Sequence, residues 1–203
     1  MVIAGFVLPP ILITRWMEPE PVARPLAGRI AGDLQAPALG PTDAAVTIVM
    51  FTDHRCPVCR RTEAVIEKGM VKGTGVRFIL KDWAILGDDS VLAARAALAA
   101  QYQGKYWPMH RALMRSTGTL DQGRIATIAA GAGVDPIRLV HDMRANAEAI
   151  EARLAQISRE ALDLRLPGTP GILVGPFLVK GGVDSGQLRK LIEEAREEAE
   201  GNS

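Results

Sequence analysis

The alternation of apolar and polar positions divides the chain into a strand-rich start, a helical middle and a second strand-rich part. Apolar and β-branched residues fill positions 45–52 and make up most of positions 76–81, which predicts two buried strands. A helix is predicted between them, from Pro57 toward Met70, because proline is tolerated in a first helical turn and glycines follow the segment. A strand, a helix and a strand in this order indicate a parallel pair with a crossover.

The middle of the chain has a helical period. Residues 90–101 are rich in alanine, and residues 106–115 form another helical pattern. Thr119 with Gln122 three residues later is typical of a capping box at the start of a further helix. We therefore predict an inserted helical domain over residues 89–166.

Strand character returns after the helical block. Residues 172–174 and 177–180 flank Gly175-Pro176, a pattern that predicts a hairpin. Asp184 is then placed to cap a last amphipathic helix. The order βαβ, helical block, ββα predicts an α/β fold with one mixed sheet and a helical insertion.

The start of the chain has a different composition. Residues 2–14 are almost wholly apolar, but a membrane-spanning helix needs about 20 residues. We expect residues 1–17 to be a signal or anchor segment, with a buried N-terminal strand as the alternative. Residues 18–41 are rich in Pro, Gly and Ala and are predicted to be a linker. The sheet domain then comprises residues 42–88 and 167–200.

Composition and charge narrow the classes of function. The chain has 203 residues, 48% of them apolar, which fits one domain that carries an insertion. Lys and Arg number 24 against 23 Asp and Glu, and no basic run interleaves with aromatic residues. Nucleic-acid binding is therefore not predicted. No cofactor and no resident metal are predicted either.

The two cysteines, Cys56 and Cys59, are the strongest chemical signal. Two cysteines three residues apart are not a disulfide framework, and a bond between them would close a loop too short to stabilise the fold much. The pair opens a predicted helix, where free N–H groups and the helix dipole favour a thiolate. We assign Cys56 as the attacking sulfur, expected to be exposed, and Cys59, one turn inward, as the resolving sulfur.

Two other interpretations of this pair remain open. The cysteines could form a plain local disulfide or be inert residues of the core. They could also bind a metal, although zinc normally needs four ligands and His54 would supply only a third. Cu(I) is selected by soft thiolates, so a Cu(I)-binding or metal-handling protein is the alternative function.

The segments FTDHRCPVC, ILGDDSVLAARAALAA, LPGTPGILVG and GVDSGQLRKLIEEA resemble the DsbA-like family of thiol-disulfide oxidoreductases, in particular its bacterial subgroup that includes ScsC. The resemblance covers about residues 37–199. It implies a thioredoxin fold with a helical insertion and a periplasmic or extracytoplasmic enzyme that oxidises or isomerises protein disulfides. It also implies partners: thiol-containing protein substrates and a membrane oxidase or reductase. The apolar start could anchor the protein to the membrane.

The same resemblance assigns roles to Thr169 and Pro170. A thioredoxin fold keeps a cis proline at this position, beside the cysteines, whereas the sequence alone also allows an ordinary trans turn. The backbone of Thr169 could then pair with an extended substrate. Pro57 and Val58, between the cysteines, are the other predicted substrate contacts.

Some positions depart from the family pattern. Val58 stands where the strong oxidant of the family has a histidine, and Met50 stands where many relatives have a glutamate beneath the active site. His54, Asp53 and Lys81 remain as candidates for tuning the thiol pKa. Asp53 could instead be a turn or cap residue, and His54 a solvated loop residue.

The other two histidines, His110 and His141, fall in the helical block, and we expect both on helix surfaces. The residues do not decide between oxidase, isomerase and reductase. We expect a reduction potential between those of the strong oxidant DsbA and thioredoxin, about −120 to about −270 mV.

Overall fold

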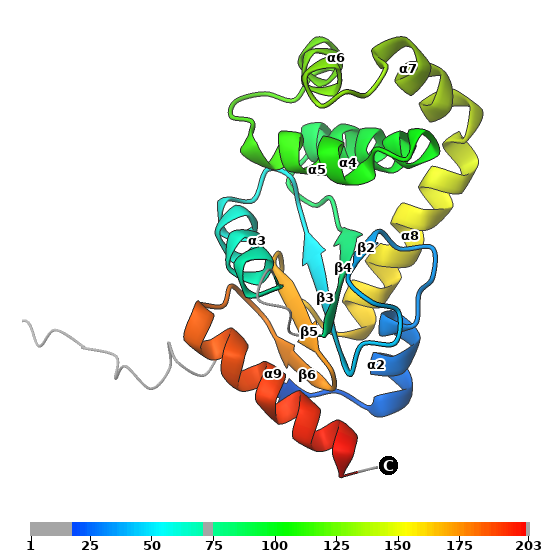
Figure 1. Ribbon diagram of the computed structural model, residues 1–203. Coiled ribbons are helices and arrows are strands. Elements are labelled where there is room, and N and C mark those ends of the chain that lie inside the picture. The colour runs from blue at the N-terminus through cyan, green and yellow to red at the C-terminus, as the bar shows by residue number, and fades with distance from the viewer. Residues whose placement is uncertain (1–17, 71–74, 202–203) are drawn as a thin grey trace, which may run out of the picture.

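Figure 1 shows the computed structural model, which describes residues 18–70 and 75–201. Over these residues, six strands form one sheet in the order β1-β6-β5-β3-β4-β2, with helices on both faces. The segment 1–17, predicted to be a signal or an anchor, lies outside the described residues. Within residues 18–70 and 75–201, no helix has both the length and the apolar character needed to cross a membrane.

The centre of the sheet consists of the predicted strands. β3 (Val46–Thr52) pairs in parallel with β4 (Val76–Asp82) and antiparallel with β5 (Gly171–Val174). β5 continues through a tight turn into β6 (Phe177–Val179), which pairs with it antiparallel. The predicted parallel pair, the hairpin and the mixed α/β sheet are confirmed.

The segment 18–41 is not a linker. It forms β1 (Glu20–Pro21), α2 (Arg24–Ala31) and β2 (Ala38–Leu39). Ala27 and Ile30 of α2 are buried, and β1 and β2 extend opposite edges of the sheet. The prediction from composition was wrong because two-residue strands and a single buried helical stripe leave little trace among Pro, Gly and Ala.

Helices cover both faces of the sheet and one of its ends (Figure 1). α3 (Pro57–Met70) and α9 (Ser185–Glu200) pack on one face, and α2 and α8 (Ala147–Asp163) pack on the other. The remaining helices gather beyond the end of β3: α4 (Asp88–Ala100), α5 (Tyr106–Arg115), α6 (Gln122–Gly131) and α7 (Pro136–Ala145).

The helix caps follow the sequence in part. Asp184 caps α9 in a full capping box with Gln187, as an aspartate before an amphipathic run predicts. The capping box predicted at Thr119 is wrong. Asp121 caps α6 instead and accepts a hydrogen bond from the N–H of Arg124 at 2.8 Å. Aspartate is a cap at least as good as threonine, and the helix starts two residues later than expected.

Candidate active site

The cysteine pair lies at the junction between β3 and α3. β3 ends at Thr52, the N–H of Cys56 donates to the carbonyl of Asp53 at 3.0 Å, and α3 begins at Pro57. Both cysteines are free thiols, and the N–H of Cys59 donates to Cys56 Sγ at 3.3 Å. A sulfur at this point receives the unpaired N–H groups of a helix start, which favour its anionic form.

The two sulfurs differ in access less than the sequence predicts. Cys59 is fully buried, as expected for a resolving thiol. Cys56, expected to be exposed, keeps only 5% of its surface because neighbouring chain covers it. Pro57 and Val58 are exposed beside it, so access to Cys56 runs past the two predicted substrate contacts.

The peptide bond between Thr169 and Pro170 is cis, as the resemblance implies. The fold brings this turn, more than a hundred residues away in sequence, against the cysteine pair. Cys56 Sγ donates to the carbonyl oxygen of Thr169 at 3.4 Å. The predicted juxtaposition of Cys56, Thr169 and Pro170 is therefore present.

The surroundings separate the pKa values of the two thiols. A hydrogen bond from the Cys59 thiol, helped by backbone N–H groups and by Thr169, outweighs burial and lowers the pKa of Cys56 to about 6. Burial, together with the same hydrogen bond, raises the pKa of Cys59 well above its ordinary value. The pair is thus built as one thiolate and one thiol.

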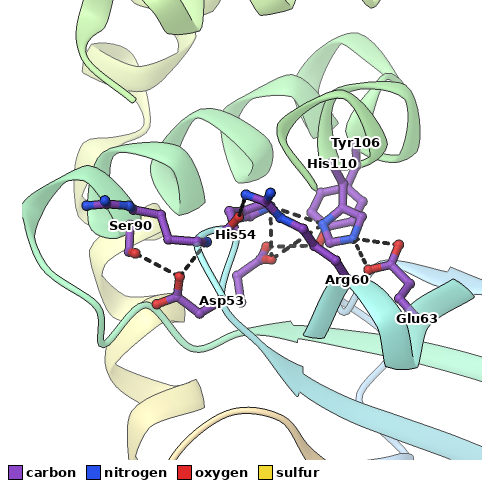
Figure 2. A network of polar contacts seen from close by, with 9 residues as sticks. Asp53, His54, Arg60, Glu63, Ser90, Tyr106 and His110 are labelled. Carbon is purple, nitrogen blue, oxygen red and sulfur yellow. Dashed lines mark hydrogen bonds and ion pairs between the residues drawn. The ribbon is translucent and has the colours of Figure 1, made fainter. Parts of the chain in front are cut away.

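The carboxylate of Asp53 organises the loops around the cysteines. It accepts hydrogen bonds from the N–H groups of Arg55 (2.8 Å), Ile85 (2.8 Å) and Leu86 (3.0 Å), and from Ser90 Oγ at 2.7 Å. Figure 2 shows the contact between Asp53 and Ser90. These contacts are those of a turn and cap residue, the alternative to a group that tunes the thiol pKa.

His54 fits neither of the two roles expected from the sequence, a cation that tunes the thiol pKa or a solvated loop residue. It is 1% exposed rather than solvated. Burial, followed by the nearby charges of His110 and Arg60, lowers its pKa well below the ordinary value. His54 is therefore neutral and does not act as a cation beside the thiolate.

Lys81 lies on the wrong face of the sheet for tuning the thiols. Successive side chains of a strand point to opposite faces, and Leu80 belongs to the same core cluster as both cysteines. Lys81 points to the opposite face, where its Nζ pairs with Asp33 and with Glu160 at 2.8 Å. Its predicted position near the active site is wrong.

A buried polar cluster beside the active site was missed. His110, expected on a helix surface, is fully buried, whereas His141 is exposed as predicted. His110 Nε2 contacts Glu63 Oε2 at 2.9 Å and its Nδ1 lies 3.0 Å from His54 Nε2. Figure 2 shows this chain of contacts between α3, α5 and the loop after β3.

Asp82 completes the cluster from the end of β4. It is 2% exposed, and its Oδ2 accepts a hydrogen bond from the hydroxyl of Tyr106 at 2.9 Å. The burial of His110 could have been predicted from the sequence. Tyr106, His110 and Leu113 share one face of α5, and all three are buried. A histidine on such a stripe belongs to the interior.

The sequence of the chain is similar to part of several longer curated proteins. Over 188 residues it is 27% identical to an Na(+)/H(+) antiporter NhaA 1 of Mycolicibacterium vanbaalenii, with 91% of the chain aligned. The chain spans about 30% of the length of that relative.

Solved structures align over most of their length. A thioredoxin-like oxidoreductase from Silicibacter pomeroyi DSS-3 is 38% identical, with a TM-score of 0.79 over 84% of this chain and 97% of the other. The thiol-disulfide exchange protein α-DsbA2 of Wolbachia pipientis is 28% identical, with a TM-score of 0.78 over 84% and 94%. The catalytic domain of Proteus mirabilis ScsC is 26% identical, with a TM-score of 0.73 over 83% and 93%.

The family profile described as thioredoxin matches residues 33–194, which is most of the chain. The cysteine pair at a helix start, the cis-proline turn beside it and the DsbA-like and ScsC structures agree with that match. The chain therefore belongs to the thioredoxin superfamily and, within it, to the DsbA-like proteins.

Proposed function

We propose that this protein is a thiol-disulfide oxidoreductase that forms or isomerises disulfides in extracytoplasmic proteins. One observation carries the proposal: Cys56 Sγ sits at the start of α3 against the carbonyl of Thr169, with the fully buried Cys59 one turn behind it. A sulfur held between a helix start and a substrate-pairing turn is placed for exchange rather than for a structural bond.

Oxidation of a client begins from the Cys56–Cys59 disulfide. A client thiolate attacks Cys56 Sγ, a mixed disulfide forms, and Cys59 leaves and takes up a proton because its pKa is raised. A second client thiolate then attacks the client sulfur and releases Cys56 as a thiolate. Two client thiols become one disulfide, and their two electrons stay on the reduced cysteine pair until a redox partner removes them.

Isomerisation starts from the reduced pair instead. The Cys56 thiolate attacks a non-native client disulfide and holds one client sulfur in a mixed disulfide. The freed client thiolate, or another one, then attacks that bond and re-forms a client disulfide with no net transfer of electrons. Cys59 releases the enzyme from a trapped client by displacing it from Cys56.

The stabilised thiolate supports an oxidising potential. Hydrogen bonds to Cys56 favour the reduced state of the pair, and a favoured reduced state makes the disulfide a stronger oxidant. Val58 supplies no hydrogen bond between the cysteines where the strong oxidant has a histidine. We therefore expect the potential to lie between about −120 mV, typical of DsbA, and about −270 mV, typical of thioredoxin.

Apolar side chains border the approach to Cys56. Val58 is 36% exposed, and Ile85 and Leu86, on the loop that Asp53 holds, are 42% and 45% exposed. Unfolded clients present apolar segments, so these side chains can hold an extended chain while its backbone pairs with Thr169. The proposed clients are therefore unfolded or misoxidised proteins in an oxidising compartment.

Equilibration of the protein with glutathione buffers tests the proposal. We expect reversible oxidation of one disulfide at a potential inside the stated range, and catalysed refolding of a reduced, denatured client that Cys56→Ser abolishes. A potential below that of thioredoxin, or no exchange with glutathione, would sink the proposal. Tight stoichiometric Cu(I) binding without exchange would instead favour the metal-handling function.

A further inference from the structure

Three buried side chains beside the active site each place one possible ligand atom within 4 Å of the other two. His54 comes from the loop after β3, Asp82 from the end of β4 and His110 from α5. His54 Nε2 lies 3.0 Å from His110 Nδ1, and Asp82 Oδ1 lies 3.7 Å and 3.9 Å from these two nitrogens. The three residues are at most 2% exposed.

We propose that His54, Asp82 and His110 form a binding site for one divalent transition-metal ion of the zinc class. A triangle with sides of 3.0, 3.7 and 3.9 Å has a circumscribed radius of about 2.1 Å. An ion at its centre would therefore lie at the usual zinc–nitrogen and zinc–oxygen distances from all three atoms. No donor atom has to move for the site to form.

A second layer of contacts orients two of the ligands. Glu63 Oε2 lies 2.9 Å from His110 Nε2 and accepts a hydrogen bond from it, so an ion bound at Nδ1 would take the place of the proton on that nitrogen. The hydroxyl of Tyr106 donates to Asp82 Oδ2 at 2.9 Å, which leaves Oδ1 for the ion. A carboxylate behind a ligating histidine is the usual arrangement around protein metal ions. Figure 2 shows Glu63, His110 and Tyr106 in this arrangement.

Two buried atoms of these three residues have no hydrogen-bond partner among the described residues, His54 Nδ1 and Asp82 Oδ1, and the second of them faces the other two ligand atoms. Asp82 Oδ1 is buried and accepts no hydrogen bond from any of the described residues. The two nitrogens nearest to Asp82 Oδ1, His54 Nε2 and His110 Nδ1, contact each other. Their distances from Asp82 Oδ1, 3.7 Å and 3.9 Å, are too long for a hydrogen bond. Buried carboxylate oxygens are normally paired, so an unpaired oxygen this close to two imidazole nitrogens fits a bound metal cation.

The donor set selects the class of ion. Two imidazoles and one carboxylate suit Zn²⁺ or Fe²⁺ and contain no soft sulfur, so Cu(I) is not favoured. The site is separate from the cysteines and stands whether or not the redox function is correct. It would tie the loop two residues before Cys56 to β4 and α5, which fixes the start of α3.

Metal binding is measured on the full, oxidised protein, in which the Cys56–Cys59 disulfide keeps both sulfurs from ligating. After treatment with a chelator, titration with Zn²⁺ should give one bound ion per chain and raise the thermal unfolding temperature. Co²⁺ in the same protein should give visible d–d bands without a thiolate charge-transfer band. An oxidised protein that binds neither ion would overturn the proposal.

Conservative variants assign the ligands. Asp82→Asn and His54→Gln should each weaken Zn²⁺ binding by more than about 100-fold, and Glu63→Gln by about 10- to 100-fold. His141→Gln, which changes the exposed histidine, is the matched control and should bind as the wild type does. Wild-type affinity in Asp82→Asn and His54→Gln, or a Co²⁺ spectrum with a thiolate band, would show that the ion binds elsewhere. The wild-type spectrum decides the question if a variant does not fold.

Discussion

At the scale of single residues, the two cysteines differ by their contacts rather than by their chemistry. Cys56 Sγ accepts hydrogen bonds from the N–H and the thiol of Cys59, whereas Cys59 is fully buried in the core. The same side chain therefore has a lowered pKa at one position and a raised pKa at the next turn. Reactivity should follow this difference.

Alkylation of the reduced protein should titrate near pH 6. Because the pKa of Cys56 is about 6 against an ordinary value of 9.0, the rate with iodoacetamide should already be close to its plateau at pH 7. Mass spectrometry after short pulses should find the label on Cys56 and not on Cys59. A rate that still rises steeply between pH 7 and 9 would contradict the thiolate assignment.

The lowered pKa of Cys56 also makes stability depend on pH. The unfolded chain binds the Cys56 proton up to about pH 9, whereas the folded protein loses it near pH 6. The reduced protein should therefore gain stability as the pH rises from about 6 to 9 and lose that gain as the pH falls through 6. The difference in urea midpoint between wild type and Cys56→Ser, measured across this range, checks the sign.

Asp53 should not tolerate replacement by asparagine. Its two oxygens accept three backbone N–H groups and one hydroxyl, and an asparagine would turn one of these oxygens into a donor that faces a backbone donor. We expect Asp53→Asn to lower the free energy of unfolding by about 1–3 kcal/mol, measured by urea denaturation. Ser90→Ala, which removes one of the four donors, should cost about 1 kcal/mol or less.

The residues that tune the site could be predicted only in part. The cysteines were found from their motif, and the cis proline from the resemblance to the family. Lys81 was expected near the cysteines because the alternation of side chains in β4 separates its two faces without showing which face meets the active site. The faces follow from pairing with β3, which a single sequence does not reveal.

At the scale of elements, the start of α3 is held by a close glycine contact. A Cβ placed on Gly182, in the loop between β6 and α9, would lie 2.8 Å from Thr62 Oγ1 and 2.9 Å from Val58 Cγ1. Both are short, branched side chains on the first turns of α3, and Thr62 is buried. The loop thus presses directly against the helix that carries the cysteines.

Gly182→Ala should push this helix start outward. We expect a loss of about 1–3 kcal/mol in unfolding free energy and slower exchange with glutathione, because the added methyl group overpacks the contact. The stability loss should shrink in a Val58→Ala, Thr62→Ala background, which removes both clashing atoms. Gly28→Ala on α2, where a Cβ meets nothing within 4 Å, is the control and should be neutral or slightly stabilising.

Element type was more predictable than element contacts. The bounds of α3 and α5 were anticipated closely, since proline at a helix start and apolar spacing are local signals. The burial of His110 was not anticipated, because it depends on α5 lying against α3 and β4. Local patterns specify a helix, and its neighbours decide which polar residue on it goes inside.

At the scale of the whole molecule, an ionic cluster joins distant parts of the chain. Lys81 on β4 contacts Asp33, which follows α2, and Glu160 on α8, and Arg153 on α8 also pairs with Asp33. Lys81 is fully buried. The cluster therefore fastens α8 and the segment after α2 to the face of the sheet opposite the cysteines.

Lys81→Met should destabilise the fold and leave the chemistry unchanged. Glu160 would lose its ion pair and stay buried, a change that costs about 3–5 kcal/mol in comparable sites. The alkylation rate of Cys56 at pH 7 should stay as in the wild type, because Lys81 faces away from it. A changed alkylation rate would show that Lys81 does influence the reactivity of Cys56. Arg95→Ala, at an exposed pair with Glu151, should cost at most about 1 kcal/mol.

Residues 18–41, which were expected to be a linker, supply the short edge strands on both sides of the sheet. β1 pairs with Phe177 and Leu178, and β2 pairs with Phe78 and Ile79, so short strands cover stretches of β6 and β4 where a foreign chain could add. A protein that binds unfolded polypeptides meets many apolar, β-forming segments that can pair with an open sheet edge. If the proposed function is correct, the two-residue strands at both edges leave such chains few backbone groups on the sheet to pair with, which lowers the risk that enzyme and client aggregate together.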